Sequence, residues 1–146
     1  MCLHQRQVGL LQQRRIVGNR ALTARQHHAS QPIIERLAPR TTDTVLVKWR
    51  YSAFQRSDLR QRMAALGRDQ LIVCGIYAHI GCMATALEAF MQDIQPFMAI
   101  DGVADFSRDE HDMAVRYVAG RCGASLTVDT IVSALSAGGA EQKGAQ

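Results

Sequence analysis

The stretch from Leu71 to Phe90, LIVCGIYAHIGCMATALEAF, is the feature that most restricts how this chain folds. It opens with an apolar run ending at Cys74, rich in β-branched residues and too short for a buried helix, which predicts a fully buried parallel strand. From His79 onward the apolar residues recur at helical spacing, so they share one face of a helix. In open parallel sheets, ligands bind beyond the carboxyl ends of the strands, beside the free N–H groups of helix N-termini. The turn at residues 77–81 is therefore the candidate binding region.

Strand and helix patterns alternate along the rest of the chain. Strands are expected at 44–49, 71–75, 97–101 and 124–128, and helices at 57–67, 79–92, 107–120 and 129–135. Ser107 and Glu110 have the spacing of a capping box, which starts the third helix. The apolar residues expected on its inward face are Met113, Ala114, Tyr117 and Val118. This alternation predicts an α/β fold with a parallel sheet and helices on both faces.

The net positive charge of the chain comes from its first 40 residues. Residues 1–40 hold seven arginines and one acid, a net charge of +6, whereas residues 41–146 hold ten basic and twelve acidic residues, a net charge of −2. A basic arm can attract phosphate groups of nucleic acid or membrane. This arm has neither aromatic residues to stack on bases nor a recognisable binding motif, so neither partner is expected.

Three segments are predicted. Residues 1–31 form a basic arm that is disordered, a marginal helix or foreign to the fold; residues 32–135 form the folded domain, and residues 136–146 form a flexible tail. Composition supports one globular domain, with 47% hydrophobic and 21% charged residues in a chain of 146. There is no apolar run of membrane-spanning length and no signal-peptide pattern, so the cytoplasm is the expected compartment.

The four cysteines have no C-x-x-C spacing. Cys74 and Cys82 lie in apolar sequence, which favours small buried side chains over disulfides or zinc ligands.

Two motifs point to a family. VLVKWRYSAF at 45–54 and GIYAHIGCMATALEAF at 75–90 resemble the isochorismatases, and the resemblance covers about residues 32–135. These hydrolases split isochorismate into pyruvate and 2,3-dihydro-2,3-dihydroxybenzoate for catechol siderophores such as enterobactin. The resemblance implies a Rossmann-like three-layer sandwich, isochorismate as substrate, no cofactor, and a homo-oligomer when the domain is intact.

The resemblance also assigns site residues. Lys48 matches the family lysine that holds the anionic groups of the substrate, whereas its sequence context alone favours a snorkelling surface lysine. Tyr77 matches a substrate-facing tyrosine preceded by a cis peptide bond, with a turn tyrosine that caps the core as the alternative. Tyr51 is expected to line the pocket, and Arg50 and Ser52 to fix its loop.

Gly81 occupies the position where related amidohydrolases of the same fold carry a nucleophilic cysteine. Isochorismatases have a small residue here, which leaves space for the substrate, so Lys48 and Gly81 are the catalytic positions that the resemblance implies. Cys82 points about 100° away around the helix and cannot replace that nucleophile.

Other polar residues of the region have plainer interpretations. His79 is interpreted as a turn residue bonded to backbone rather than a base, and no metal site is expected because no second ligand lies at metal spacing. Asp101 and Asp105 follow a strand and are interpreted as loop or cap carboxylates rather than catalytic acids.

One element of the family is missing. Its general acid is an aspartate at the end of the first strand, but the first aspartate of this chain is Asp43, directly before the Lys48 strand. The first two strands, which lie in the middle of the family's sheet, have no counterpart here, so the Lys48 strand should be separated from the later ones. The alternative to an isochorismatase is therefore an inactive remnant or an assembly partner that docks through an exposed strand edge.

Overall fold

The computed structural model describes residues 10–13, 35 and 38–141. Its elements are β1 (Leu10–Gln13), β2 (Val45–Lys48), α1 (Leu59–Ala65), β3 (Gln70–Ile76), the π-helical turn η2 (Ala78–Cys82), α2 (Met83–Phe90), β4 (Gln95–Ala104), α3 (Arg108–Arg121), β5 (Ala124–Leu126) and α4 (Val128–Glu141). Every described strand pair is parallel, as the alternation of strands and helices predicts. None of the described helices is long and apolar enough to cross a membrane.

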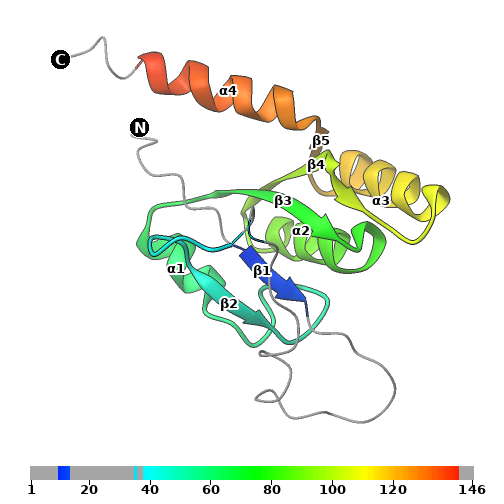
Figure 1. The fold of residues 1–146 in the computed structure, drawn as a ribbon, viewed down its shortest axis with the longest axis horizontal. Helices are drawn as coiled ribbons and strands as arrows, with labels where there is room; N and C mark the ends of the chain where they lie inside the picture. The colour runs from blue at the N-terminus through cyan, green and yellow to red at the C-terminus, as the bar shows by residue number, and fades with distance from the viewer. Residues whose placement is uncertain (1–9, 14–34, 36–37, 142–146) are drawn as a thin grey trace.

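The strands form two sheets. β3, β4 and β5 make a sheet in that order, while β2 pairs only with β1 among the described strands. The separation of the Lys48 strand from the later strands is therefore confirmed (Figure 1). β1 was not predicted, because its four residues, LLQQ, carry too weak a pattern within the basic arm. The rest of that arm, with Cys2, lies outside the described residues.

The main core lies between the three-stranded sheet and the helices α2 and α3, which lie side by side in Figure 1. Val73, Met98 and Val103 from the strands are buried there against Ala86 and Val118 from the helices. α4 contacts the opposite face of the sheet. Gly102 of β4 faces away from this core, and a methyl group added to it would lie 3.4 Å from Cγ2 of Val128, the first residue of α4. The sheet thus has helices on both faces, as predicted.

A second core fixes α1. Phe54 and Met63 are buried with Ala89 and Ile94, which connects α1 to the end of α2. Gly67 ends α1 as predicted, since its φ of +61° is a conformation that glycine adopts without a steric penalty.

The capping box of α3 is confirmed, because Glu110 N–H donates to Ser107 Oγ at 3.2 Å. The prediction that Met113 and Tyr117 face inward is wrong: these side chains are exposed, and only Ala114 and Val118 are fully buried. The buried face of α3 is narrower than the set of apolar residues in its sequence, because only residues four apart, Ala114 and Val118, are fully buried. α4 also continues to Glu141, beyond the predicted end at Leu135.

β3 leaves one side of the sheet uncovered. Ile72, Cys74 and Ile76 alternate with buried Val73 and are exposed, so the prediction that Cys74 is buried is wrong. The alternation of side chains places them away from α2 and α3. β3 is also an edge strand within the described sheet, since its only partner there is β4.

Two glycines give a matched test of this packing. A methyl group on Gly123 would lie 2.5 Å from the Pro96 carbonyl oxygen, whereas one on Gly120 in α3 would meet nothing within 4 Å. Gly123→Ala should therefore lower the free energy of unfolding by about 1–3 kcal/mol. Gly120→Ala should raise it by up to about 1 kcal/mol, because alanine is the better helix former. Urea unfolding followed by circular dichroism measures both, and equal effects would contradict the placement of Gly123 against β4.

Candidate functional site

A buried hydroxyl brings the two sequence motifs together. Thr85 Oγ1 accepts a hydrogen bond from Ala53 N–H at 3.1 Å and donates one to the Gly81 carbonyl oxygen at 2.7 Å. A side-chain bond between Gln55 and Glu88, at 2.7 Å, adds a second connection. The loop after β2 is therefore held against η2 and α2, although the motifs are separated by more than 20 residues.

Lys48 lies at the end of β2 with only 6% of its surface exposed. Burial lowers the pKa of its ammonium group, and the nearby Cys82 thiol partly opposes that shift. No hydrogen bond or ion pair joins this ammonium to another described residue. The side chain of Lys48 is thus largely buried next to the η2 turn.

The turn after β3 has the backbone that the resemblance implies. The Ile76–Tyr77 peptide bond is cis, and Tyr77 is followed directly by η2. The Tyr77 carbonyl oxygen accepts hydrogen bonds from the N–H groups of Gly81 at 2.9 Å and Cys82 at 3.2 Å. Gly81 is buried at this point, where its carbonyl also contacts Thr85.

The two tyrosines have different environments. The half-buried Tyr77 ring stacks on Phe106, with 3.9 Å between ring centroids and 20° between planes. Tyr51 is 56% exposed and projects from the loop after β2. Ser52 is buried and accepts a hydrogen bond from Phe54 N–H at 3.2 Å, in keeping with a role in fixing that loop.

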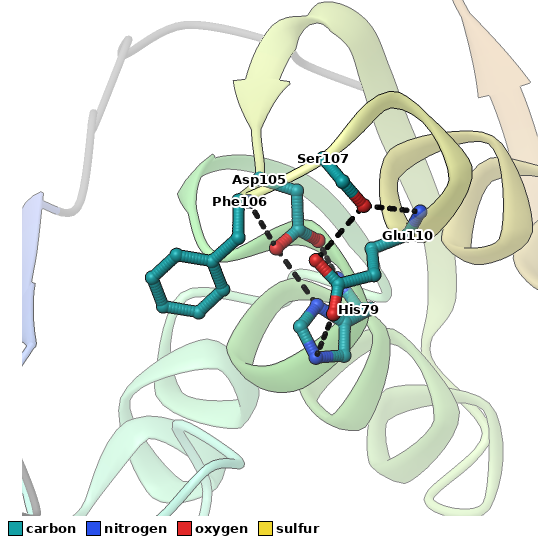
Figure 2. A network of polar contacts seen from close by, with 5 residues as sticks. All are labelled: His79, Asp105, Phe106, Ser107 and Glu110. Atoms are coloured by element: carbon teal, nitrogen blue, oxygen red, sulfur yellow. Dashed lines mark hydrogen bonds and ion pairs between the residues drawn. The ribbon is translucent and has the colours of Figure 1, made fainter.

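His79 is the residue that sequence reasoning described least well. Its ring Nδ1 lies 2.7 Å from Asp105 Oδ1, and its backbone N–H donates to Asp105 Oδ2 at 2.6 Å. His79 Nε2 lies 3.8 Å from Glu110 Oε1, so the ring stands between two carboxylates (Figure 2). The interpretation of His79 as bonded to backbone is wrong, because its ring bonds to a side chain. No second ligand lies at metal spacing in the sequence, but the fold brings the distant Asp105 and Glu110 to the ring.

Asp105 is a cap carboxylate, as predicted. Burial alone would raise its pKa, but hydrogen bonds from the His79 N–H and ring and from Phe106 N–H outweigh burial, so the pKa lies below its usual value. Asp101 also caps, since its Oδ1 accepts from Val128 N–H at 2.7 Å where α4 begins. Neither carboxyl group is arranged to donate a proton.

Cys82 is buried among apolar side chains in the main core. Burial raises the pKa of its thiol to about 11, although the positive charge of Lys48 acts in the opposite direction. A thiol with that pKa is almost entirely protonated at neutral pH, which disfavours a nucleophilic role.

Two surface hollows lie away from Lys48, Tyr77 and Gly81. The larger, of about 410 Å³, is lined by the outer side of β2 and the start of α1, and the second, of about 330 Å³, lies beside Phe90 and Asp93. Neither is lined by Lys48, Tyr77 or Gly81.

Sequence reasoning missed Thr85, Phe106 and Glu110. Thr85 has a signal in the sequence, because a threonine four residues after Gly81 on a helix can donate to the Gly81 carbonyl. The stacking of Phe106 on Tyr77 and the approach of Glu110 to His79 depend on how α3 packs beside η2, which no local pattern encodes.

Comparison with known proteins gives a consistent result. Residues 7–130 match the isochorismatase domain family. The chain is 58% identical over 104 residues to enterobactin synthase component B of Escherichia coli (strain K12), covering 71% of this chain and 36% of that protein. It is 54% identical over 105 residues to the isochorismatase of Bacillus subtilis (strain 168), covering 72% of this chain and 34% of that protein. Both relatives are thus matched over only about a third of their length.

The fold has matches among solved structures as well. A cysteine hydrolase from Pseudomonas syringae pv. phaseolicola 1448A superposes with a TM-score of 0.69 at 23% identity, covering 73% of this chain and 55% of that one. At this identity the match shows the fold alone.

The buried Lys48 should reduce stability. We expect Lys48→Met to raise the free energy of unfolding at pH 7 by about 1 kcal/mol, at the low end of the gains seen when buried charges are replaced by apolar side chains. Because the pKa of Lys48 in the folded chain lies below its ordinary value of 10.5, the unfolded chain binds more protons just below pH 10.5, and wild type gains stability there with rising pH. The advantage of Lys48→Met should therefore shrink toward pH 10. Arg60→Met, on the exposed face of α1, is the control; an equal gain from both variants would contradict a buried Lys48.

Cys82 should resist alkylation. At pH 8 its thiolate fraction in the folded chain should be roughly a hundredfold below that of an unfolded cysteine, given a pKa of about 11. Iodoacetamide labelling followed by peptide mass spectrometry should therefore leave Cys82 unmodified until urea is added. Rapid native labelling of Cys82 would show that the thiol is activated.

Proposed function

Because the chain belongs to the isochorismatase family, we propose that its folded part carries one half of a site that hydrolyses the vinyl ether of isochorismate. The observation that carries the proposal is the largely buried Lys48, held at the end of β2 beside η2 without a carboxylate partner among the described residues. Burying a charge is costly, and a protein retains such a charge where a ligand of opposite charge compensates it. Isochorismate is a dicarboxylate and fits that requirement.

Each proposed residue has a separate task. Lys48 attracts a carboxylate of the substrate, and the attraction is stronger than at an exposed site because most of the side chain is buried. Tyr77, held against Phe106, offers a hydroxyl and an aromatic edge to the substrate, and the exposed Tyr51 is available to line the pocket from the loop after β2. Gly81 keeps the start of η2 free of a side chain, so that the substrate can approach the backbone.

The reaction requires an acid as well. A proton added to the terminal vinyl carbon creates an oxocarbenium ion, and water attacks its carbon. The resulting hemiketal breaks its C–O bond, releasing pyruvate and 2,3-dihydro-2,3-dihydroxybenzoate. Asp43 and Asp105 cannot supply that proton readily, because hydrogen bonds from Arg40 and His79, respectively, keep both pKa values low. We assign the acid to a segment that the relatives have outside the matched 104 residues.

The alternative function is that of an inactive remnant or an assembly partner. The observation in its favour is the exposed edge and apolar side of β3, which would accept a strand or a subunit from outside. A turnover assay separates the two functions.

The first experiment measures the chain by itself. It should release no pyruvate from isochorismate above the buffer rate, because positioned acid catalysis contributes about 10²–10⁴ in rate and the described residues offer no suitable donor. The measurement is a coupled lactate dehydrogenase assay on chain purified from a host lacking isochorismatase. Turnover by this preparation would contradict the assignment of the acid to another segment.

The second experiment restores the missing part by fusing the upstream segment of a full-length isochorismatase to residue 32. In an active fusion, Lys48→Ala should lower kcat/KM at least about 100-fold, equivalent to about 2.7 kcal/mol of transition-state stabilisation. Gly81→Ala should act mainly on KM by crowding, and Cys82→Ser should be nearly silent.

Arg60→Ala removes an exposed positive charge from α1 and is the control for net charge. A fusion in which Cys82→Ser abolishes turnover while Lys48→Ala does not would overturn the proposed site in favour of a thiol mechanism. A fusion that folds but stays inactive would favour the alternative function, an inactive remnant or an assembly partner.

A further inference from the structure

We propose that His79 and Glu110 form a binding site for a divalent transition-metal ion such as Zn²⁺ or Co²⁺, with Asp105 orienting the imidazole ring. The site lies where η2 meets the start of α3 (Figure 2). It is separate from the proposed hydrolytic function and uses none of the residues assigned to it.

The ring of His79 is fixed in the orientation that metal ligation needs. Asp105 has a fully buried side chain and accepts as a carboxylate, so the 2.7 Å contact assigns a proton to His79 Nδ1. Nε2, on the opposite edge of the ring, is then the nitrogen that can ligate a metal. A carboxylate behind a histidine is the usual outer partner of a metal-binding imidazole, where it fixes the ring and raises its basicity.

Glu110 supplies the second ligand at a suitable distance. Its Oε1 lies 3.8 Å from His79 Nε2, too far for a hydrogen bond. Two ligands that share a tetrahedral zinc ion at about 2.1 Å each lie about 3.4 Å apart, so a small rotation of the Glu110 side chain suffices. Its other oxygen accepts a hydrogen bond from Ser107 Oγ at 3.1 Å, which keeps the carboxylate facing the ring.

Access and charge favour an ion here. The side chains of His79 and Glu110 are 22% and 40% exposed, so solvent reaches the space between them and water can complete the coordination. Two carboxylates face one imidazole ring, and Arg108, the arginine in the first turn of α3, is paired with Asp112 at 2.8 Å. The surplus negative charge is therefore left for a cation.

The ligand types select the class of ion. One imidazole nitrogen with a carboxylate oxygen suits zinc, cobalt or nickel, whereas magnesium and calcium prefer oxygen ligands only. The capping box explains the bond between Ser107 and Glu110 Oε2. It does not explain why Glu110 Oε1 faces His79 Nε2, and a shared ion would.

The test is a Co²⁺ titration of the full-length, ¹⁵N-labelled chain by NMR, because paramagnetic broadening reports the position of the ion. Long-range ¹H–¹⁵N spectra resolve the imidazole rings of all five histidines, including those of the arm. The His79 ring and the N–H groups of residues 105–110 should broaden at lower Co²⁺ concentration than the His111 ring. Broadening confined to the arm or to His111 would overturn the proposal.

Two matched variants sharpen the result. Glu110→Gln removes the charge but keeps a capping-box residue, so α3 should remain intact by circular dichroism. It should weaken Co²⁺ binding at His79 at least about 10-fold. Asp109→Asn removes the same charge from an exposed neighbour in the same helical turn and should change the affinity by less than about twofold. Equal effects of the two substitutions would show that the ion responds only to local negative charge, and the ligand assignment would be wrong.

Discussion

A single hydroxyl group, that of Thr85, determines how the two halves of the candidate site meet. It is 3% exposed and uses both its donor and its acceptor capacity, with Gly81 on one side and Ala53 on the other. A buried hydroxyl with both bonds made gives direction as well as attachment, because neither partner can shift without leaving a polar atom unpaired. β2 has no strand partner in the three-stranded sheet, so the position of Lys48 relative to that sheet depends on this hydroxyl, on the Gln55–Glu88 bond and on the packing of Phe54 against Ala89 rather than on strand pairing.

The sequence predicted the order of the elements from β2 onward and the parallel sheet, because strand and helix periods are local properties of the chain. The separation of β2 followed instead from the resemblance to the isochorismatases. The sequence also predicted the turn around Tyr77 and Gly81, since the motif there is continuous. It failed where burial depends on distant partners. Cys74 lies in an apolar run whose pattern predicts a strand buried on both faces. In the described structure, however, no element covers one face of β3.

The environment of His79 shows the same limit at the level of chemistry. Asp105 and Glu110 lie 26 and 31 residues further along the chain, and only the packing of α3 beside η2 brings their carboxylates to the ring. Lys48 illustrates the opposite case. A lysine at the end of a strand is usually a surface side chain, whereas the motif around Lys48 indicated a site residue. The burial of Lys48 agrees better with the motif.

The open side of β3 has a consequence for how this chain can pair with another. Ile72 and Ile76 are exposed beside a strand edge whose N–H and carbonyl groups have no sheet partner on that side among the described residues. Such an edge is a template on which any extended segment can add, and natural proteins usually protect it with charges, a proline or a covering helix. Here the edge carries neither a charge nor a proline between Leu71 and Ile76, and the register shift between Val73 and Gly75 is what interrupts it. The two flanking segments, rather than the whole strand, are therefore where another extended chain could pair.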